Sequence, residues 1–193
     1  KLLWSKGYKS IAGVDEVGRG AFAGPLVAAS VVLPIGFKSN GIKDSKLLTF
    51  KKRELLSAYI LKNALFYSIS EVSVEFINKY GVGEATHQAF RKCINDLEGK
   101  CDFVLVDGFK IKSFKNEQKA IIHGDNLSVS IAAASIIAKV YRDNLMRNLH
   151  LEYEKYDFLN NKGYGTKFHQ EALKKYGLSS VHRTSFNLQR FLG

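Results

Sequence analysis

The hydrophobic positions of the 193-residue chain fall into two patterns, short apolar runs typical of strands and apolar residues at helical spacing. Runs bounded by Gly, Pro or charged residues predict five strands, at 11–17, 26–33, 64–72, 103–106 and 120–122. Helical spacing predicts helices at 49–62, 73–80, 83–97, about 126–149, and 167–176. Thr49 is expected to be the N-cap of the first helix.

The order of these elements predicts an α/β fold. The short, glycine-rich segment between the first two strands predicts a hairpin, and the later strands are separated by helical crossovers. This order suits one mixed sheet with helices packed on its faces. In such sheets the carboxyl ends of the strands are the usual place for a functional site.

Composition narrows the class of protein. With 46% hydrophobic residues and only two prolines, the chain can build a core and shows no linker or repeat. A net charge of +11 favours a polyanionic partner, although charge alone leaves a merely basic, soluble chain equally open. Cys93 and Cys101 form neither a disulfide framework nor a zinc motif, which favours a reduced, cytoplasmic protein.

We expect neither a signal peptide nor a membrane span. The first ten residues contain no long apolar region. The most apolar helical stretch, 127–140, contains three serines and Lys139, so it is too short and too polar to cross a bilayer.

Acidic residues stand at three element ends, namely Asp15-Glu16, Asp107 and Asp125. Each alone has an ordinary interpretation: an exposed pair before a turn, a β-turn aspartate, and a helix N-cap. Adjacent carboxylates on a regular strand point to opposite faces, so Asp15 and Glu16 are expected to share a site only if the backbone turns there.

The combination of these acids in a basic protein points to a metal site. Clustered carboxylates repel one another unless cations neutralise them, and oxygen ligands without Cys or His select Mg²⁺ or Mn²⁺ over zinc. Two such ions suit phosphodiester hydrolysis. The five histidines show no metal-ligand spacing and are predicted to be structural or exposed, with His123 at most beside the site.

Two glycine-rich segments could approach a nucleic acid closely. Residues 18–24 (GRGAFAG) miss the dinucleotide-binding spacing and run into a strand, so they favour backbone contact with a ribose 2′-hydroxyl instead. Residues 162–166 expose Tyr164 between glycines, where its ring could lie against a sugar or base. Ser45 and Lys46, in a polar loop after Asp44, could hold a phosphate.

Together these segments resemble the ribonuclease HII family over nearly the whole chain. The motifs that carry the resemblance, in chain order, are residues 13–20 (GVDEVGRG), 23–29 (AGPLVAA), 44–46 (DSK), 106–108 (VDG), 124–125 (GD), 133–143 (AASIIAKVYRD), 162–164 (KGY) and 182–186 (HRTSF). Val17 stands where the family often has alanine, and His123 where lysine is common.

The resemblance implies a ribonuclease H-like fold, with a central mixed five-stranded sheet flanked by helices and a helical C-terminal part. It implies a catalytic domain at 1–150 and a C-terminal part at 151–193 that carries the tyrosine. The implied functional residues are the metal-binding and catalytic Asp15, Glu16, Asp107 and Asp125, the 2′-hydroxyl readers Gly18, Arg19 and Gly20, the phosphate contact Lys46, and Tyr164 on the downstream deoxyribose. Asp143 is expected to anchor its helix.

The activity implied is two-metal-ion hydrolysis, with Mg²⁺ or Mn²⁺, of the RNA strand of RNA–DNA hybrids and on the 5′ side of single ribonucleotides in duplex DNA. The products would carry a 3′-hydroxyl and a 5′-phosphate. The alternatives are a ribonuclease HIII-like enzyme, a DNA-specific nuclease of the same fold, and a catalytically inactive duplex binder. A monomer is expected, and no sliding-clamp motif is evident after Phe191.

Overall fold

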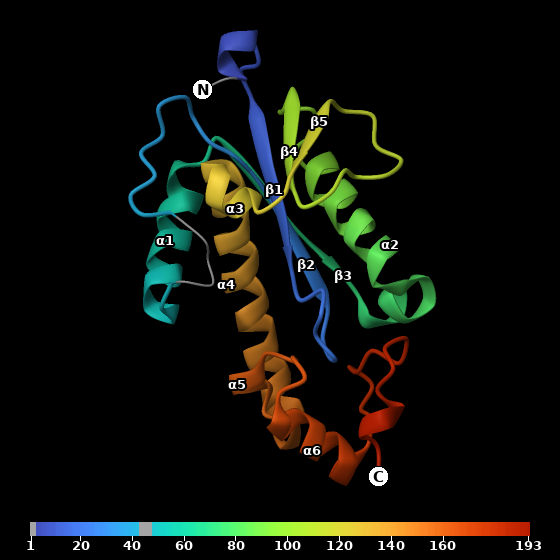
Figure 1. Ribbon diagram of the computed structural model, residues 1–193. Coiled ribbons are helices and arrows are strands. Elements are labelled where there is room, and N and C mark those ends of the chain that lie inside the picture. The colour runs from blue at the N-terminus through green and yellow to red at the C-terminus, as the bar shows by residue number, and fades with distance from the viewer. Residues whose placement is uncertain (1–2, 43–47) are drawn as a thin grey trace.

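The computed structural model describes residues 3–42 and 48–193. Its centre is a five-stranded sheet in the order β3-β2-β1-β4-β5 (Figure 1). The strands are β1 (Ile11–Val17), β2 (Leu26–Val32), β3 (Phe66–Val72), β4 (Phe103–Asp107) and β5 (Gln118–Ile121). Antiparallel pairs join β1 to β2 and β2 to β3, whereas β1, β4 and β5 are parallel, so the predicted hairpin and the mixed sheet are confirmed.

Helices cover both faces of this sheet (Figure 1). They are α1 (Phe50–Asn63), α2 (Val74–Asn95), α3 (Gly124–Leu127), α4 (Val129–Glu152), α5 (Phe158–Asn161) and α6 (Lys167–Tyr176), with short 3-10 turns at Trp4–Lys6, Glu154–Tyr156 and Gln189–Phe191. Thr49 caps α1 as predicted, because its side chain accepts a hydrogen bond from the Lys52 N–H. The two helices predicted at 73–97 form α2, with non-helical Gly81 between them.

The core is divided between the two faces because side chains alternate along each strand. Val14 and Ala28 pack with α2, whereas Val27 and Ala29 pack with α1 and α4. A third cluster, with Met146 and the C-terminal segments as its centre, lies beyond the end of the sheet. No helix in the described residues is long and apolar enough to cross a bilayer.

The predicted long helix is interrupted at its start. Ser128 has an extended backbone (φ −130°, ψ 120°), so α4 begins at Val129 and the preceding turn forms the separate α3. Asp125 therefore lies inside α3 and is not an N-cap. The Gly124 N–H donates to the Asp107 carboxylate at 2.7 Å, which ties α3 to β4.

Helix α4 crosses β1 in direct backbone contact. A Cβ atom at Gly13 would collide with the backbone of Ser130 and Ile131, so only glycine fits there. This contact places the sheet-facing side of α4, including Ser135, over the carboxyl half of β1.

Candidate active site

A pocket of about 440 Å³ opens at the carboxyl ends of β1 and β4. Three carboxylate residues line it together with residues of α4 and of the C-terminal part. The full lining is Asp15, Glu16, Val17, Asp107, Ser135, Lys139 and Tyr164. The structure thus brings together residues predicted from three separate stretches of sequence.

The sheet explains why these acids meet. Strands β1 and β4 are parallel and pair as far as Val14 and Val106, so the next residues, Asp15 and Asp107, leave neighbouring strands at the same edge. The β1–β2 ladder continues regularly to Val17, and the expectation of a backbone turn between Asp15 and Glu16 is wrong. Both residues reach the pocket because the β1–β4 ladder ends before them.

The pocket disfavours the ionised form of the Asp15 carboxyl group, which is 6% exposed. Burial raises its pKa well above the usual range, and the charges of Glu16 and Asp107 raise it further, against hydrogen bonds from Ser135 and from the Glu16 N–H. A cation among these three carboxylates would relieve this repulsion.

Asp125 lies apart from this pocket. It is buried and lines a separate hollow of about 190 Å³ beside the start of α4. Its carboxylate accepts a hydrogen bond from the Asn126 side chain at 3.2 Å. Its neighbour Gly124 is bonded to Asp107, so the chain at Asp125 passes directly beside the pocket.

The glycine loop, residues 18–24, borders the pocket and is held from behind by two arginines, both fully buried. The Arg183 guanidinium donates to the carbonyls of Gly18, Arg19 and Gly24 at 2.7–3.0 Å. Among the described residues, neither Arg19 nor Gly20 uses its own backbone N–H in a hydrogen bond. The loop therefore presents unused donors at its exposed tip.

The tyrosine loop, residues 162–166, packs directly on the glycine loop. The N–H groups of Phe22 and Ala23 donate to the Gly163 carbonyl at 2.8 and 3.2 Å. Gly163 has φ +82°, and a Cβ there would collide with the Ala23 carbonyl, so this approach requires glycine.

Arg142 of α4 joins the two loops. Its guanidinium donates to the carbonyls of Ala23, Pro25 and Lys162 at 2.9–3.1 Å and lies 5.5 Å from the centre of the Tyr164 ring. Gly18 and its φ of +87° are part of this packing, since a Cβ at Gly18 would meet the Arg142 side chain.

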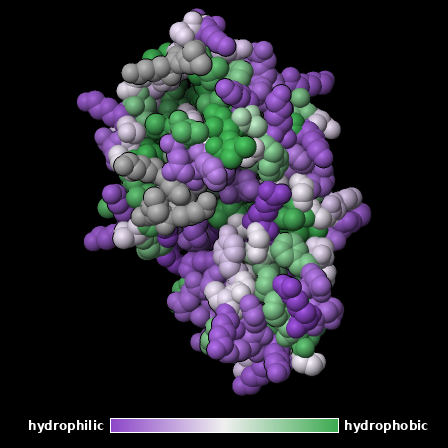
Figure 2. Space-filling view, viewed as in Figure 1, coloured by the Kyte–Doolittle hydropathy of each residue, from purple (hydrophilic) through white to green (hydrophobic). Residues whose placement is uncertain are grey.

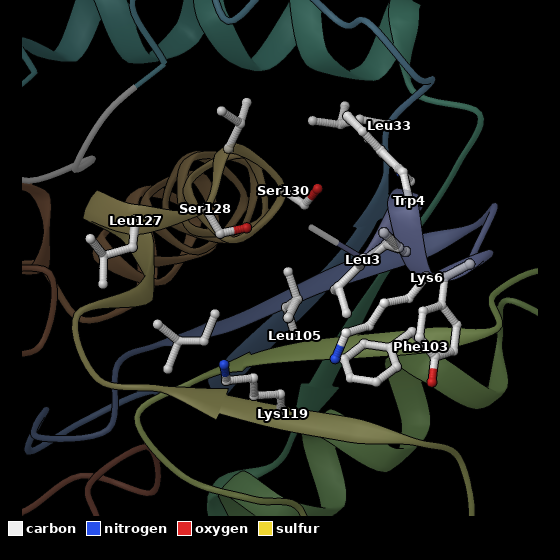
Figure 3. Close-up of a pocket in the computed structure, with 14 residues that line it drawn as sticks. Leu3, Trp4, Lys6, Leu33, Phe103, Leu105, Lys119, Leu127, Ser128 and Ser130 are labelled. Carbon is white, nitrogen blue, oxygen red and sulfur yellow. The ribbon is translucent and has the colours of Figure 1, made fainter. Parts of the chain in front are cut away.

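A second pocket, of about 470 Å³, is apolar and lies at the opposite ends of the same strands, where β1 and β4 begin at Ile11 and Phe103. Figure 3 shows its lining, in which Lys6 and Lys119 are the charged residues among leucines and aromatic rings. Hydrophobic side chains gather around a hollow in the upper part of the molecule, above a mostly hydrophilic C-terminal part (Figure 2). Its described lining residues include no carboxylate, the anionic ligand that binds Mg²⁺ or Mn²⁺ in proteins.

Comparison with known proteins identifies the family. A model of the ribonuclease HII family matches residues 12–189. The chain belongs to the ribonuclease HII family. A ribonuclease HII from Syntrophus aciditrophicus (strain SB) is 46% identical over 186 residues, covering 96% of this chain and 88% of that protein. One from Clostridium perfringens (strain SM101 / Type A) is 50% identical over 182 residues, covering 93% and 67%.

A solved relative agrees with this family. The crystal structure of ribonuclease H2 from Pyrococcus horikoshii OT3 matches with a TM-score of 0.77 at 28% identity, covering 94% of this chain and 98% of that chain. The expected ribonuclease H-like fold is thereby confirmed, and the chain is a ribonuclease H, a nuclease and hydrolase. The match to ribonuclease HII decides against the ribonuclease HIII alternative.

Ribonucleases H depend on divalent metals, and the donor chemistry of the carboxylate pocket fits such ions. Its three acids are hard oxygen ligands, and burial together with the charges of Glu16 and Asp107 raises the pKa of Asp15, an effect that a bound cation would offset. Within the described ranges, no three Asp, Glu, His or Cys side chains already stand in the geometry of a metal site. Of the four acids expected to bind metal, Asp125 lines the separate hollow beside α4 and not the carboxylate pocket.

Sequence reasoning missed two polar residues of the pocket, Ser135 and Lys139. Together with Asp143 they recur every four residues on the mainly apolar helix α4, and this polar stripe was the available signal. Lys139 donates to Asp143 at 2.6 Å, and Arg53 of α1 lies 3.9 Å from the other Asp143 oxygen. Asp143 thus joins α4 to α1, as expected for a helix anchor, and orients Lys139.

Two of the histidines form a buried pair in the C-terminal part. His169 and His182 are 0% and 1% exposed, and their Nε2 atoms lie 3.0 Å apart. His169 Nδ1 must donate to the Tyr164 carbonyl at 3.0 Å, and His182 Nδ1 must accept from the Ser179 N–H at 2.9 Å. The His182 Nε2–H therefore donates to His169 Nε2, which requires both rings to be neutral. The prediction that these histidines are structural agrees with this geometry.

The pair makes stability depend on pH. Burial, together with the neighbouring His169, lowers the pKa of His182 to about 4. A folded-state pKa below the unfolded value means that the unfolded chain binds more protons between about pH 4 and 6.5, so stability rises with pH across this window. We expect the melting temperature to rise from pH 4.5 to 6.5 and this rise to be smaller in His182→Asn. An identical slope in both proteins, measured by calorimetry, would contradict a buried neutral pair.

The remaining predicted contact, Lys46, lies outside the described residues, as does the rest of the Asp44–Lys46 motif.

Proposed function

We propose that this protein hydrolyses the RNA strand of RNA–DNA hybrids and cuts on the 5′ side of single ribonucleotides in duplex DNA, leaving 3′-hydroxyl and 5′-phosphate ends. The observation that carries the proposal is the carboxylate pocket, which adjoins the glycine loop and is lined by Tyr164. Hydrolytic groups and groups suited to reading a sugar thus lie within one site.

In this proposal Asp15, Glu16 and Asp107 would hold two divalent ions, and Asp125 would be the fourth ligand. Bound Mg²⁺ or Mn²⁺ supplies Lewis acidity that activates water and stabilises the departing 3′-oxygen. The protein itself contributes positioning and charge. Lys139 places an ammonium at the pocket, where it can attract the phosphate.

The substrate is read by its sugars. The free N–H groups at the tip of the glycine loop are suited to a 2′-hydroxyl, which is the group that distinguishes RNA from DNA. Gly18, Arg19 and Gly20 are therefore assigned to the ribonucleotide, and Tyr164 to the following deoxyribose. Residues 1–150 form the catalytic domain, and 151–193 the C-terminal part that carries the tyrosine.

A labelled DNA duplex with one ribonucleotide tests this function directly. With Mg²⁺ or Mn²⁺ we expect a single cut on the 5′ side of the ribonucleotide, and no cut in the matched all-DNA duplex. Equal cutting of the two duplexes would refute the substrate assignment, and loss of cutting in EDTA tests the metal requirement.

Tyr164→Ala is expected to weaken cutting at a single ribonucleotide about tenfold more than cutting of a long hybrid, because a long hybrid offers no RNA-to-DNA junction. The magnitude corresponds to roughly 1–3 kcal/mol for one aromatic contact. Tyr164→Phe keeps the ring and serves as the control, with a preference near that of the wild type. A uniform loss on both substrates would argue against junction sensing.

A further inference from the structure

A three-residue strap of the C-terminal part, residues 181–183, contacts the back of the glycine loop. The Gly24 N–H donates to the Val181 carbonyl at 2.9 Å, and the Arg183 N–H donates to the Phe22 carbonyl at 2.8 Å. Ala23 and His182 form an isolated β-bridge between them. The strap is thus paired with the loop as a short strand would be, across about 160 residues of sequence.

The side chains of the strap diverge toward two different loops. Arg183 enters the glycine loop and binds the carbonyls of Gly18 and Arg19. His182 points the other way, into the aromatic cluster of Tyr156 and Phe158, where it meets His169.

From His182 a chain of hydrogen bonds runs to the tyrosine loop. It begins at the Ser179 N–H, passes through His182 and His169, and ends at the Tyr164 carbonyl. Because donor and acceptor roles are fixed at both ends, every hydrogen bond in this series points the same way, from Ser179 to Tyr164, and each ring carries only one N–H. Both imidazoles are buried, so water cannot replace a broken link without opening the cluster.

We propose that His169 is a positioning residue that holds Tyr164 in register with the Gly18–Gly20 tip by donating to the Tyr164 carbonyl, and that His182 of the strap fixes the His169 tautomer that makes this donation. This inference rests on the proposed function, in which the two loops read neighbouring sugars. The strap thus binds the glycine loop through Arg183 and, through His182, sets the protonation pattern of the His169 ring that holds the tyrosine loop. The spacing between the ribonucleotide reader and the tyrosine is then fixed before substrate binds.

A matched pair of substitutions at His169 separates positioning from packing. In His169→Asn the amide replaces Nδ1 and can still donate to the Tyr164 carbonyl, whereas in His169→Gln the amide reaches the position of Nε2 and keeps only the contact with His182. Both variants lose the same ring from the same cluster, so their melting temperatures are expected to fall alike.

The readout is the ratio of kcat/KM on a single-ribonucleotide duplex to kcat/KM on a long hybrid. We expect His169→Gln to lower this ratio about tenfold and His169→Asn to leave it within about twofold of the wild type, since one lost hydrogen bond to a buried group has about this effect. In a Tyr164→Ala background, the additional effect of His169→Gln on the ratio should vanish.

Equal ratios in the two His169 variants, or an undiminished effect of His169→Gln in the Tyr164→Ala background, would overturn the positioning role. The proposed function fails separately, if Tyr164→Ala alone leaves the ratio unchanged. Nitrogen-15 NMR of the wild-type imidazoles at pH 7 provides a test without activity. We expect the neutral Nδ1–H tautomer at His169 and the neutral Nε2–H tautomer at His182. A positively charged imidazolium at either position would refute this hydrogen-bond chain.

Discussion

Asp15→Asn is expected to abolish hydrolysis while making the folded protein more stable. The change removes a ligand from the carboxylate pocket, and we expect turnover to fall at least about a hundredfold, as for the loss of one electrostatic group at a reaction centre. Stability rises because the carboxylate is held in the pocket at a disadvantage: burial, Glu16 and Asp107 all raise its pKa.

The sign of the stability change follows from that shift. A carboxyl group with a raised folded-state pKa contributes stability below its unfolded pKa and loses it as pH rises through the folded-state value. At pH 7.5, well above the pKa of an aspartate in the unfolded chain, the raised pKa of Asp15 therefore destabilises the fold, and asparagine removes this effect. Melting should be measured in EDTA, because bound cations would offset the repulsion.

Asp102→Asn is the matched control. Asp102 stands just before β4, at the opposite end from Asp107, and accepts hydrogen bonds from the N–H groups of Lys9 and Ser10 at 2.7 and 3.1 Å. Its substitution should lower the melting temperature and leave turnover nearly unchanged. An Asp15→Asn variant that is less stable than the wild type, or that retains near-normal turnover, would contradict the role assigned to Asp15.

Arg183→Lys is expected to be among the most destabilising single changes in this protein, even though it keeps the charge. The guanidinium serves three carbonyls, those of Gly18, Arg19 and Gly24, from a planar fork that a single ammonium cannot reproduce. Burial and the charge of Arg142 lower the pKa of Arg183 to about 9, so it is still a cation at pH 7.

At about 1–3 kcal/mol for each buried acceptor left unpaired, we expect a loss of about 3 kcal/mol, measured by urea denaturation. The same substitution at Arg190, an exposed residue of the last 3-10 turn, is the control and should change stability by less than about 0.5 kcal/mol. Equal effects of the two substitutions would mean that the carbonyl contacts of Arg183 contribute little.

The acids of the pocket could be predicted because local pattern carried the information. Asp15 and Asp107 end apolar runs that read as strands, and parallel strands bring such ends to one edge of a sheet. Glu16 was predicted to lie in the pocket on the expectation of a backbone turn, but the strand continues without a turn through Glu16. Asp125 shows the limit, because the break at Ser128 that places it in α3 left no mark in the helical periodicity.

The supports of the site could not be predicted from pattern. The contact between Ala23 and His182 joins residues far apart in sequence through a segment too short to show any periodicity. Arg142 and Arg183 belong to motifs that carry the family resemblance but received no role from the sequence, and only the fold shows that both are fully buried against backbone carbonyls. The polar stripe marks Ser135 on α4, but only the fold shows that this stripe faces the pocket.

The missing side chain at Gly13 has a consequence well beyond its own position. Because the backbones of β1 and α4 touch there, the distance between sheet and helix is set by a single absent methyl group. An alanine would act as a wedge, lifting the helix along its whole first half and carrying Ser135 away from Asp15, two residues further along the strand. The distance between the strand and the helix that line the pocket thus depends on Gly13, which does not itself line the pocket.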